Sequence, residues 1–272
     1  LHLSIRRQRQ MCIRDSMEII DIIAILGALA WLPQIFLWIY HWLQKPKVNV
    51  YHDEEAEVGF IKFGNAFNIR LSFLSRHKNA LIDNIELIIK DKDGANHTFK
   101  WIWYSETLYE LQAPAGNATM AKRQNAIAIN AYKDVLIEKF VGFQSISFIE
   151  ERKQLTYKLN SFIENPKIAG EINVDMVKRS NEYNQLLRLY KNSMIWKTGD
   201  YQAICKIHIA DTNEYIEHLF HFTLSDIEID TLKKNIGFAS KVIEIEFING
   251  QQQLEGSWLW ATPSINNQII AP

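Results

Sequence analysis

Residues 84–103 read NIELIIKDKDGANHTFKWIW and contain two short apolar runs on either side of a turn. In the runs at 84–90 and 97–103, apolar side chains recur at every second position, which is typical of half-buried strands. The turn between them is Asp-Lys-Asp-Gly, and Gly94 supplies a position that tolerates a positive φ. The stretch therefore predicts two antiparallel strands joined by a tight turn.

Strand-like alternation recurs on both sides of this hairpin. It is found at 67–75, 201–210, 214–223 and 241–247. The short turn at 211–213 separates two alternating runs and predicts a second hairpin. We therefore expect a mainly β fold, an antiparallel β-sandwich.

The stretch before the second hairpin is similar to part of a known fold. Gly199, Asp200 and Tyr201 resemble the approach to strand F of an immunoglobulin-like sandwich, where a tyrosine folds back at the corner. Ala203 stands where antibody domains have a disulfide cysteine. The resemblance implies an immunoglobulin-like β-sandwich without that disulfide.

Helical periodicity replaces strand alternation over about 151–192, which predicts a helical insertion between strands. In the second half of the insertion, Tyr183, Leu186, Leu187 and Tyr190 share one helical face. This apolar stripe must be covered either by the sandwich or by another chain. The four residues are therefore the candidate partner surface.

Three local signals complete the chain. Asp175 is the expected N-cap of the second helix in the insertion. Ser225 precedes acidic residues and predicts a short helix over 225–236. Residues 111–124 are rich in Ala, Pro, Gly and Asn, which predicts a loop.

An uncharged apolar stretch lies near the N-terminus. From Ile22 to Leu43 the chain reads IIAILGALAWLPQIFLWIYHWL, 22 residues of which 18 are apolar. A helix of this length measures about 33 Å and is long enough to cross a bilayer. Trp38, Tyr40 and Trp42 gather at its C-terminal end, where amphipathic rings favour the headgroup region. The stretch predicts a single transmembrane helix with these residues as its anchor.

The flanks of this stretch predict its orientation. Residues 1–16 contain RQRQMCIRDS, which resembles translated sequencing-adapter sequence, so we expect a non-native leader and a natural start at Met17. Lys45 and Lys47 then carry the flanking positive charge and predict a cytoplasmic C-terminal domain. If residues 1–16 are native, their four arginines outnumber these two lysines and the domain faces outward.

These features divide the chain into four parts. We expect a leader over 1–16, a transmembrane helix over 17–44, a β-sandwich domain over 45–260 and an irregular tail over 261–272. The helical insertion belongs to the third part.

Composition excludes several classes of function. The chain of 272 residues has 30 Lys+Arg and 31 Asp+Glu, a balance that leaves no electrostatic footprint for nucleic acid. Phosphate-loop, dinucleotide and nucleophile-elbow motifs do not occur in the sequence. Cys205 is the one cysteine outside residues 1–16, and we expect it to be a small core residue. We expect no cofactor and no catalytic residues.

Four side chains on the second hairpin are weak metal candidates. His208, Glu217, His218 and His221 have the right chemistry, but metal ligands must converge. His218 and His221 project from opposite faces of a strand because their separation is odd. His221 with Glu217, or His218 with His208, could still share a face. We expect no metal site.

Together these features predict a bacterial, single-pass membrane-anchored binding or scaffolding protein instead of an enzyme. Its expected partners are the lipid bilayer and a membrane or cytoplasmic protein, because confinement to a membrane raises the effective concentration of other membrane-bound molecules. Two alternatives stay open, namely an unfamiliar metal-assisted hydrolase and an outward-facing sensor domain.

Overall fold

The computed structural model describes residues 23–24, 27, 29–113, 116–164, 174–247 and 257–266 of the chain. The chain divides into two compact units, Leu1–Lys45 and Pro46–Pro272. The expected leader over 1–16 lies outside the described residues.

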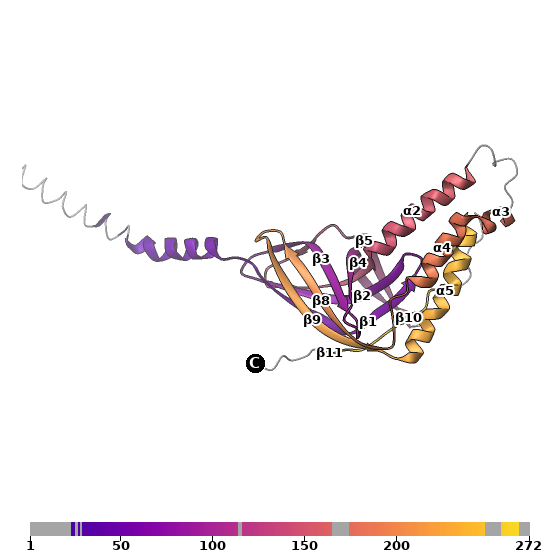
Figure 1. Cartoon of the computed structure of the whole chain (residues 1–272). Helices are drawn as coiled ribbons and strands as arrows, with labels where there is room; N and C mark the ends of the chain where they lie inside the picture. The colour runs from indigo at the N-terminus through magenta and orange to yellow at the C-terminus, as the bar shows by residue number, and fades with distance from the viewer. Residues whose placement is uncertain are drawn as a thin grey trace, which may run out of the picture. The chain divides into compact units, whose positions relative to one another are not determined.

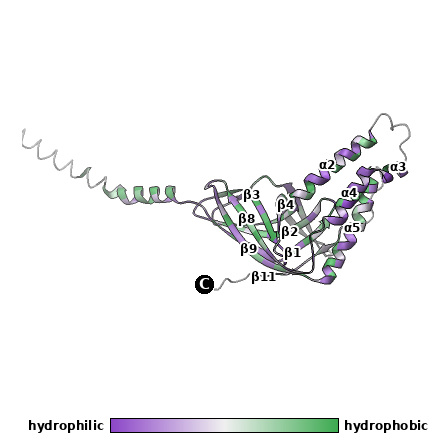
Figure 2. Cartoon of the chain, viewed as in Figure 1, coloured by the Kyte–Doolittle hydropathy of each residue, from purple (hydrophilic) through white to green (hydrophobic). Residues whose placement is uncertain are grey.

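The first unit contains a helix over residues 29–43. Its large apolar side chains are exposed, and those of Trp31, Trp38 and Trp42 are 66–67% accessible. Figure 2 shows the hydrophobic character of this helix, which precedes β1. Among the described residues, no helix combines the length and the apolarity that crossing a membrane requires. Ile22, the expected start of the span, is not one of these residues.

The second unit combines strands with helices. Its strands are β1 (Lys47–Ile61), β2 (Gly64–Arg76), β3 (Ala80–Lys90), β4 (Asn96–Ala113), β5 (Gly116–Asn125), β6 (Ile129–Ala131), β7 (Leu136–Ser145), β8 (Gly199–Ile209), β9 (Glu214–Leu224), β10 (Trp260–Ala261) and β11 (Ile265–Asn266). Its helices are α2 (Ile146–Ile163), α3 (Val174–Arg179), α4 (Asn181–Asn192) and α5 (Asp226–Phe247).

The strands form a single antiparallel sheet (Figure 1). Its order is β10-β1-β2-β7-β4-β3-β8-β9-β11, with β5 paired to β4 and β6 paired to β3. The hairpin predicted at 84–103 is β3 and β4, with Leu87 opposite Phe99, and β8 with β9 forms the second hairpin. The mainly β, antiparallel class is confirmed. The immunoglobulin-like form is not confirmed, because the strands are hydrogen-bonded into one curled sheet.

The C-terminal segment joins the two edges of this sheet. β10 pairs with β1, and β11 pairs with β9 so that Ile265 lies opposite Phe222. Between the two short strands, the amide of Ala56 donates to the carbonyl of Pro263 at 3.2 Å. The expected irregular tail, 261–272, therefore differs from the structure in its first half, which lies between β1 and β9.

The inner side of the curled sheet encloses the core. On β2, alternate side chains from Phe67 to Phe73 are no more than 1% exposed. Across the interior, the Phe67 ring lies 6.0 Å from that of Phe220 and 5.5 Å from that of Phe222, measured between centroids. Burying each such side chain contributes about 1.5–3 kcal/mol. Alternation in the strands is therefore set by burial on this side.

Helices α2, α4 and α5 pack at one end of the sheet (Figure 1). We name this the helical end, where β2 begins, and the opposite end, where β1 begins at Lys47, the proximal end. The insertion expected over 151–192 is confirmed as helical, although α2 already begins at Ile146. Its second long helix is capped by Ser180, whose hydroxyl accepts a hydrogen bond from the Tyr183 amide at 3.1 Å. Asp175, the expected cap, lies instead in the first turn of α3.

The strand expected at 241–247 is wrong, because these residues form the last turns of α5. Val242 and Ile243 are buried on adjacent positions of the helix. Glu244 points to another side and forms an ion pair with Lys178 at 2.6 Å. Helix packing and ion pairing therefore override the β-like alternation of KVIEIEF.

Local signals succeed at the other end of α5 and fail at β5. The Ser225 amide donates to the Glu228 carboxylate at 2.8 Å, and the Glu228 amide donates to Ser225 Oγ at 3.4 Å, a reciprocal capping box that confirms the predicted helix start.

The loop predicted at 111–124 is wrong, because β4 extends to Ala113 and pairs with β5. Cross-strand pairing stabilises this turn-rich composition as a hairpin.

Candidate functional site

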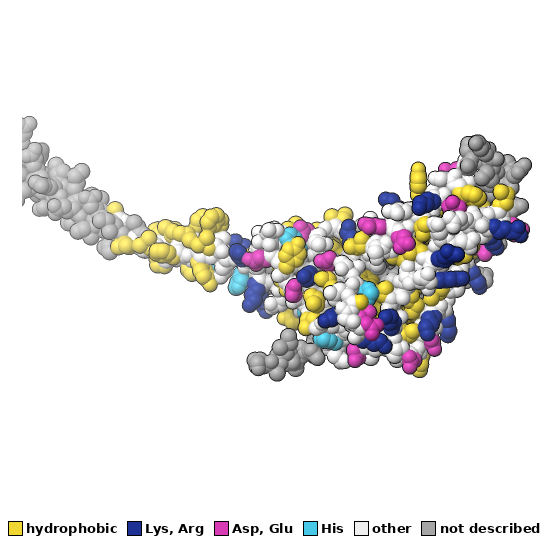
Figure 3. Space-filling model, viewed as in Figure 1, with side chains coloured by type: hydrophobic (Ala, Val, Ile, Leu, Met, Phe, Trp, Pro, Cys, Tyr) yellow, Lys and Arg dark blue, Asp and Glu magenta, His cyan; other side chains and the backbone are white. Residues whose placement is uncertain are grey.

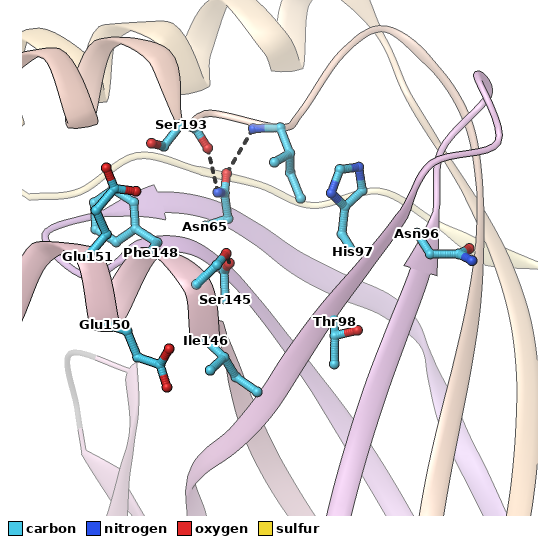
Figure 4. Close-up of a pocket in the computed structure, with 12 residues that line it drawn as sticks. Asn65, Asn96, His97, Thr98, Ser145, Ile146, Phe148, Glu150, Glu151 and Ser193 are labelled. Carbon is cyan, nitrogen blue, oxygen red and sulfur yellow. Dashed lines mark hydrogen bonds between the residues drawn. The ribbon is translucent and has the colours of Figure 1, made fainter.

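A cavity of about 540 Å³ opens at the helical end of the sheet. Its walls come from the turn between β1 and β2, the start of β4, the first turns of α2 and residues 193–195 after α4 (Figure 4). Hydroxyl, amide and carboxylate side chains make up most of the lining. The cavity therefore offers many hydrogen-bonding groups to a ligand.

Asn65 fixes one wall of this cavity. Its side chain is 1% exposed, and its amide nitrogen donates to the carbonyl of Ser193 at 2.7 Å. The amide oxygen of Asn65 accepts a hydrogen bond from the Ile195 backbone at 3.1 Å (Figure 4). One buried side chain thus ties the segment after α4 to the start of β2.

Gly64 allows α2 to approach this turn closely. Its φ is +85°, and a Cβ at this position would lie 2.4 Å from the Phe148 ring. Phe148, on the first turn of α2, is buried and packs against Phe60 and Tyr190. The absence of a side chain at Gly64 therefore positions the α2 wall of the cavity.

Asp91 and His97 hold the β4 wall. One carboxylate oxygen of Asp91 accepts backbone hydrogen bonds from Asp93 at 3.0 Å and Ala95 at 2.9 Å. The other lies 3.3 Å from Nε2 of His97. Burial raises the pKa of Asp91, but the hydrogen bonds from Ala95, His97 and Asp93 together lower it below its usual value. Asp91 is therefore an ionised anchor for the imidazole at neutral pH.

Glu150 and Glu151 place two carboxylates on the α2 side of the cavity (Figure 4). Both residues are exposed, and neither forms an ion pair within the described part of the chain. Ser145, the N-cap of α2, makes no side-chain capping bond, and its hydroxyl lies 3.2 Å from that of Ser147. The two carboxylates therefore have no ion-pair partner in the described part of the chain, and the adjoining Arg152 pairs with Glu246 instead.

The arrangement is suited to hydrogen bonding with a polar ligand. Within the cavity, His97 pairs with Asp91, and the hydroxyl of Ser145 pairs with that of Ser147. Carboxylates beside hydroxyl and amide groups favour a ligand with a cationic hydrogen-bond donor. The cavity can therefore recognise an ammonium or guanidinium group.

Two of the metal candidates on the second hairpin have partners of their own. His208 Nδ1 lies 2.6 Å from the Asp83 carboxylate, and Nε2 lies 3.0 Å from the Asn213 amide oxygen. Both hydrogen bonds raise the pKa of His208. Glu217 lies 3.3 Å from the Lys206 ammonium across the hairpin. These contacts are cross-strand polar pairs and do not converge on one point.

The other two candidates lie on opposite faces of β9, as their spacing predicts. His218 pairs in register with Cys205 and points into the interior, where its ring lies 5.0 Å from that of His52. Burial lowers the pKa of His218 to about 4, and His52 adds to this shift. His221 lies opposite Gln202 on the outer face. Within the described residues, no group of three potential ligand side chains could hold a metal ion.

The candidate partner surface on α4 is covered by the protein itself. Tyr183, Leu186 and Tyr190 are no more than 5% exposed, and Leu187 packs against the core. The Tyr190 hydroxyl donates to the carbonyl of Lys62 and accepts a hydrogen bond from Arg152. These four residues therefore do not form an exposed docking surface as expected, because α2, α5 and the sheet cover them.

Cys205 occupies the core position expected from its alternating context. Its side chain is 1% exposed, and burial raises the pKa of its thiol to about 12. A thiol that stays protonated is a poor nucleophile. Cys205 is therefore a packing residue.

The cavity could not be predicted from the sequence, because four segments that are far apart in the chain form it. Asn65 and Glu150 belong to no spacing motif, and they meet only once α2 folds back over the β1–β2 turn. The Gly64-Asn65 pair is the one local signal, since a glycine with positive φ marks a turn.

Comparison with known proteins adds little to this geometry. No protein-family model matches the chain, and no curated protein matches it. A solved structure that matches is a family 123 glycoside hydrolase from Clostridium perfringens, at 8% identity and a TM-score of 0.31. The match covers 67% of this chain and 27% of that one, so the chain spans about a quarter of its length. A likeness at this level carries no argument about fold or activity.

Proposed function

We propose that this chain is a single-pass membrane-anchored binding protein, with residues 22–43 as the anchor. The support is the uncharged stretch itself and the exposure of its described side chains, such as Phe36 at 65% and Trp38 at 66%. Figure 3 shows hydrophobic side chains gathered along this segment. Burial in hydrocarbon contributes about 1.5–3 kcal/mol for each such side chain. Tyr40 and Trp42 suit the headgroup interface that follows.

The proposed orientation places the β domain in the cytoplasm. Its support is Lys45 and Lys47, which follow the apolar stretch directly. Alkaline carbonate extraction should leave the protein in the membrane pellet, and recovery in the supernatant would contradict the anchor. A cytoplasm-active reporter fused after Pro272 should be active, whereas an export-dependent reporter should be silent. The reverse pattern would favour an outward-facing sensor domain.

We further propose that the cavity at the helical end binds a lysine or arginine side chain of a protein partner. The observation that carries this proposal is the pair of exposed carboxylates, Glu150 and Glu151, which form no ion pair among the described residues and lie beside hydroxyl and amide groups. Charge-assisted hydrogen bonds to a carboxylate are about twice as strong as neutral ones. The cavity lies at the opposite end of the sheet from the anchored N-terminus of β1, so it faces away from the start of the domain.

Short peptides with a central Lys, Arg, Gln or Glu test this function on the full chain in detergent. Calorimetric titration should detect binding of the Lys and Arg peptides, weakened by added salt. The double substitution Glu150→Gln and Glu151→Gln should weaken this binding by roughly tenfold, the loss of about one charge-assisted hydrogen bond.

The matched control is Glu54→Gln with Glu55→Gln, another adjacent and exposed pair of glutamates on β1. It removes the same charge without altering the cavity, so binding should stay unchanged. Equal weakening in both variants would show that overall charge, not the cavity, attracts the peptides. Indifference to the central residue of the peptide would reject the proposed ligand class.

A further inference from the structure

The proximal end of the sheet exposes apolar and aromatic side chains. The proximal rim consists of Leu81, Tyr132, Val135, Leu136 and Tyr215, which are 39–62% exposed. The strand register brings them to one end: the start of β7 lies opposite the end of β2, and the start of β3 lies beside β6 and the end of β8. The start of β9 lies beside that same end of β8.

Hydrogen bonds hold the central part of the proximal rim outward. In the connection from β6 to β7, the Asp134 amide donates to the carbonyl of Ser75 at 2.8 Å. The Lys133 amide donates to the side-chain oxygen of Asn79 at 2.8 Å. Because two adjacent residues in the middle of this connection are tied to the β2–β3 region, the backbone that carries the exposed Tyr132 is held in place.

The chain enters the domain at the proximal end, a few residues after the proposed anchor. The helix of the first unit ends at residue 43, and β1 begins at Lys47. Four Cα–Cα steps span at most about 14 Å in extended chain. The polar layer of a bilayer is of order 5–8 Å thick on each side. A connection this short lets the proximal end of the domain reach the headgroups.

The chemistry of the proximal rim matches that layer. Tyrosine carries an apolar ring and a polar hydroxyl, the combination that favours the membrane interface. Lys47 and Lys133 are exposed beside the apolar side chains and complement anionic headgroups. Apolar residues flanked by lysine are the composition of surfaces that lie on membranes.

We propose that the proximal rim is a membrane-contact surface, which seats Tyr132, Val135 and Leu136 in the headgroup layer of the leaflet next to the anchor. This inference rests on the proposed membrane anchor and adds a second attachment to it. Two contacts fix the domain's orientation, so the cavity at the helical end points away from the lipid. The partner of this surface is the anionic bilayer itself.

A fluorophore whose emission depends on polarity tests the proposal in the full chain. The background carries Cys12→Ser, and Cys205 is buried and keeps its thiol protonated, so a new cysteine is the labelling site. Leu136→Cys places the label on the proximal rim. Ile227→Cys is the matched control, since Ile227 is 80% exposed and follows the end of β9 at the helical end.

Both labelled proteins are reconstituted in phosphatidylcholine vesicles with and without phosphatidylglycerol. The emission maximum of the label at residue 136 should shift to shorter wavelength. Lipids with a quencher on the headgroup should quench this label several-fold more than the label at residue 227. Lys133→Glu should reduce this difference in the phosphatidylglycerol vesicles.

Flotation of the vesicles separates the two proposals. Protein that floats but shows equal quenching at both positions overturns the membrane contact and leaves the anchor intact. Protein that does not float overturns the anchor and the inference that rests on it. A spectral shift at residue 136 that follows protein concentration and not lipid identifies a second copy as the occupant and also overturns the inference.

Discussion

Gly64, the first residue of β2, has a φ of +85°, and the Phe148 ring occupies the space that a Cβ would fill. A left-handed backbone costs a non-glycine residue about 1–2 kcal/mol, and overpacking costs a further 1–3 kcal/mol. Gly64→Ala should therefore lower the free energy of unfolding by about 2–5 kcal/mol, measured by urea denaturation.

Gly94 is the matched control for this substitution. It has the same φ of +85°, but the nearest atom to a Cβ there is Lys90 Cε at 4.0 Å. Gly94→Ala should cost about 1–2 kcal/mol, the backbone cost alone. Equal losses in the two variants would mean that the Phe148 contact contributes nothing.

His218 makes stability depend on pH in a predictable direction. Burial lowers the pKa of His218 to about 4, whereas the pKa in the unfolded chain is about 6.5. Between these two values the unfolded chain binds a proton that the folded chain does not. Stability should fall as the pH drops from about 6.5 to 4, by about 1–2 kcal/mol once solvent screening of this partly exposed ring is allowed for. His218→Leu should remove this decrease, measured by urea unfolding at about pH 7 and about pH 4.5.

His208 supplies a control of opposite sign. Hydrogen bonds to Asp83 and Asn213 raise its pKa, so its contribution to stability is present at low pH and is lost as the pH rises. His208→Gln should therefore make the decrease toward low pH larger. A decrease that persists unchanged in His218→Leu would show that another group causes it.

Elements differ in how well the sequence predicts them, and α5 shows why. The start of α5 could be predicted because Ser225 and Glu228 form reciprocal hydrogen bonds within one turn. Its end could not be predicted, because the alternation at 241–247 satisfies a strand pattern while helix packing buries Ile243. Hairpins with short turns, such as β3–β4, were predictable because their contacts are local. The cavity was not, since its walls are brought together only by long-range packing.

The helical state of this segment can be tested with two isoleucines of α5. Ile243 is 0% exposed and Ile227 is 80% exposed. Ile243→Ala should destabilise the domain by about 2–4 kcal/mol through lost burial and a residual cavity, measured by urea denaturation. Ile227→Ala should change stability by less than about 0.5 kcal/mol. Comparable effects would contradict the burial of one face of α5 at this end.

At the scale of the whole molecule, the sheet has two edges, and the chain itself joins them. An unpaired edge strand exposes backbone groups that can pair with another chain. Here β10 and β11 follow each other in sequence, so one short segment contacts both β1 and β9. The helical insertion and α5 cover the sheet at one end and leave the proximal end free. The fold therefore separates the proximal end of the domain from the end that carries the cavity.

The C-terminal segment should control the exposure of both edges together. Ile265 is 7% exposed and lies opposite Phe222, so Ile265→Asp places a charge in the core and should release β11 and, through the short connection, β10. Hydrogen–deuterium exchange should become faster in β1 and β9 at once, and light scattering should show association through the freed edges. Asn266→Asp, at the neighbouring exposed position, should leave both readings unchanged. Faster exchange in β9 alone would mean that β10 holds β1 independently, and that the two edges are protected by separate contacts.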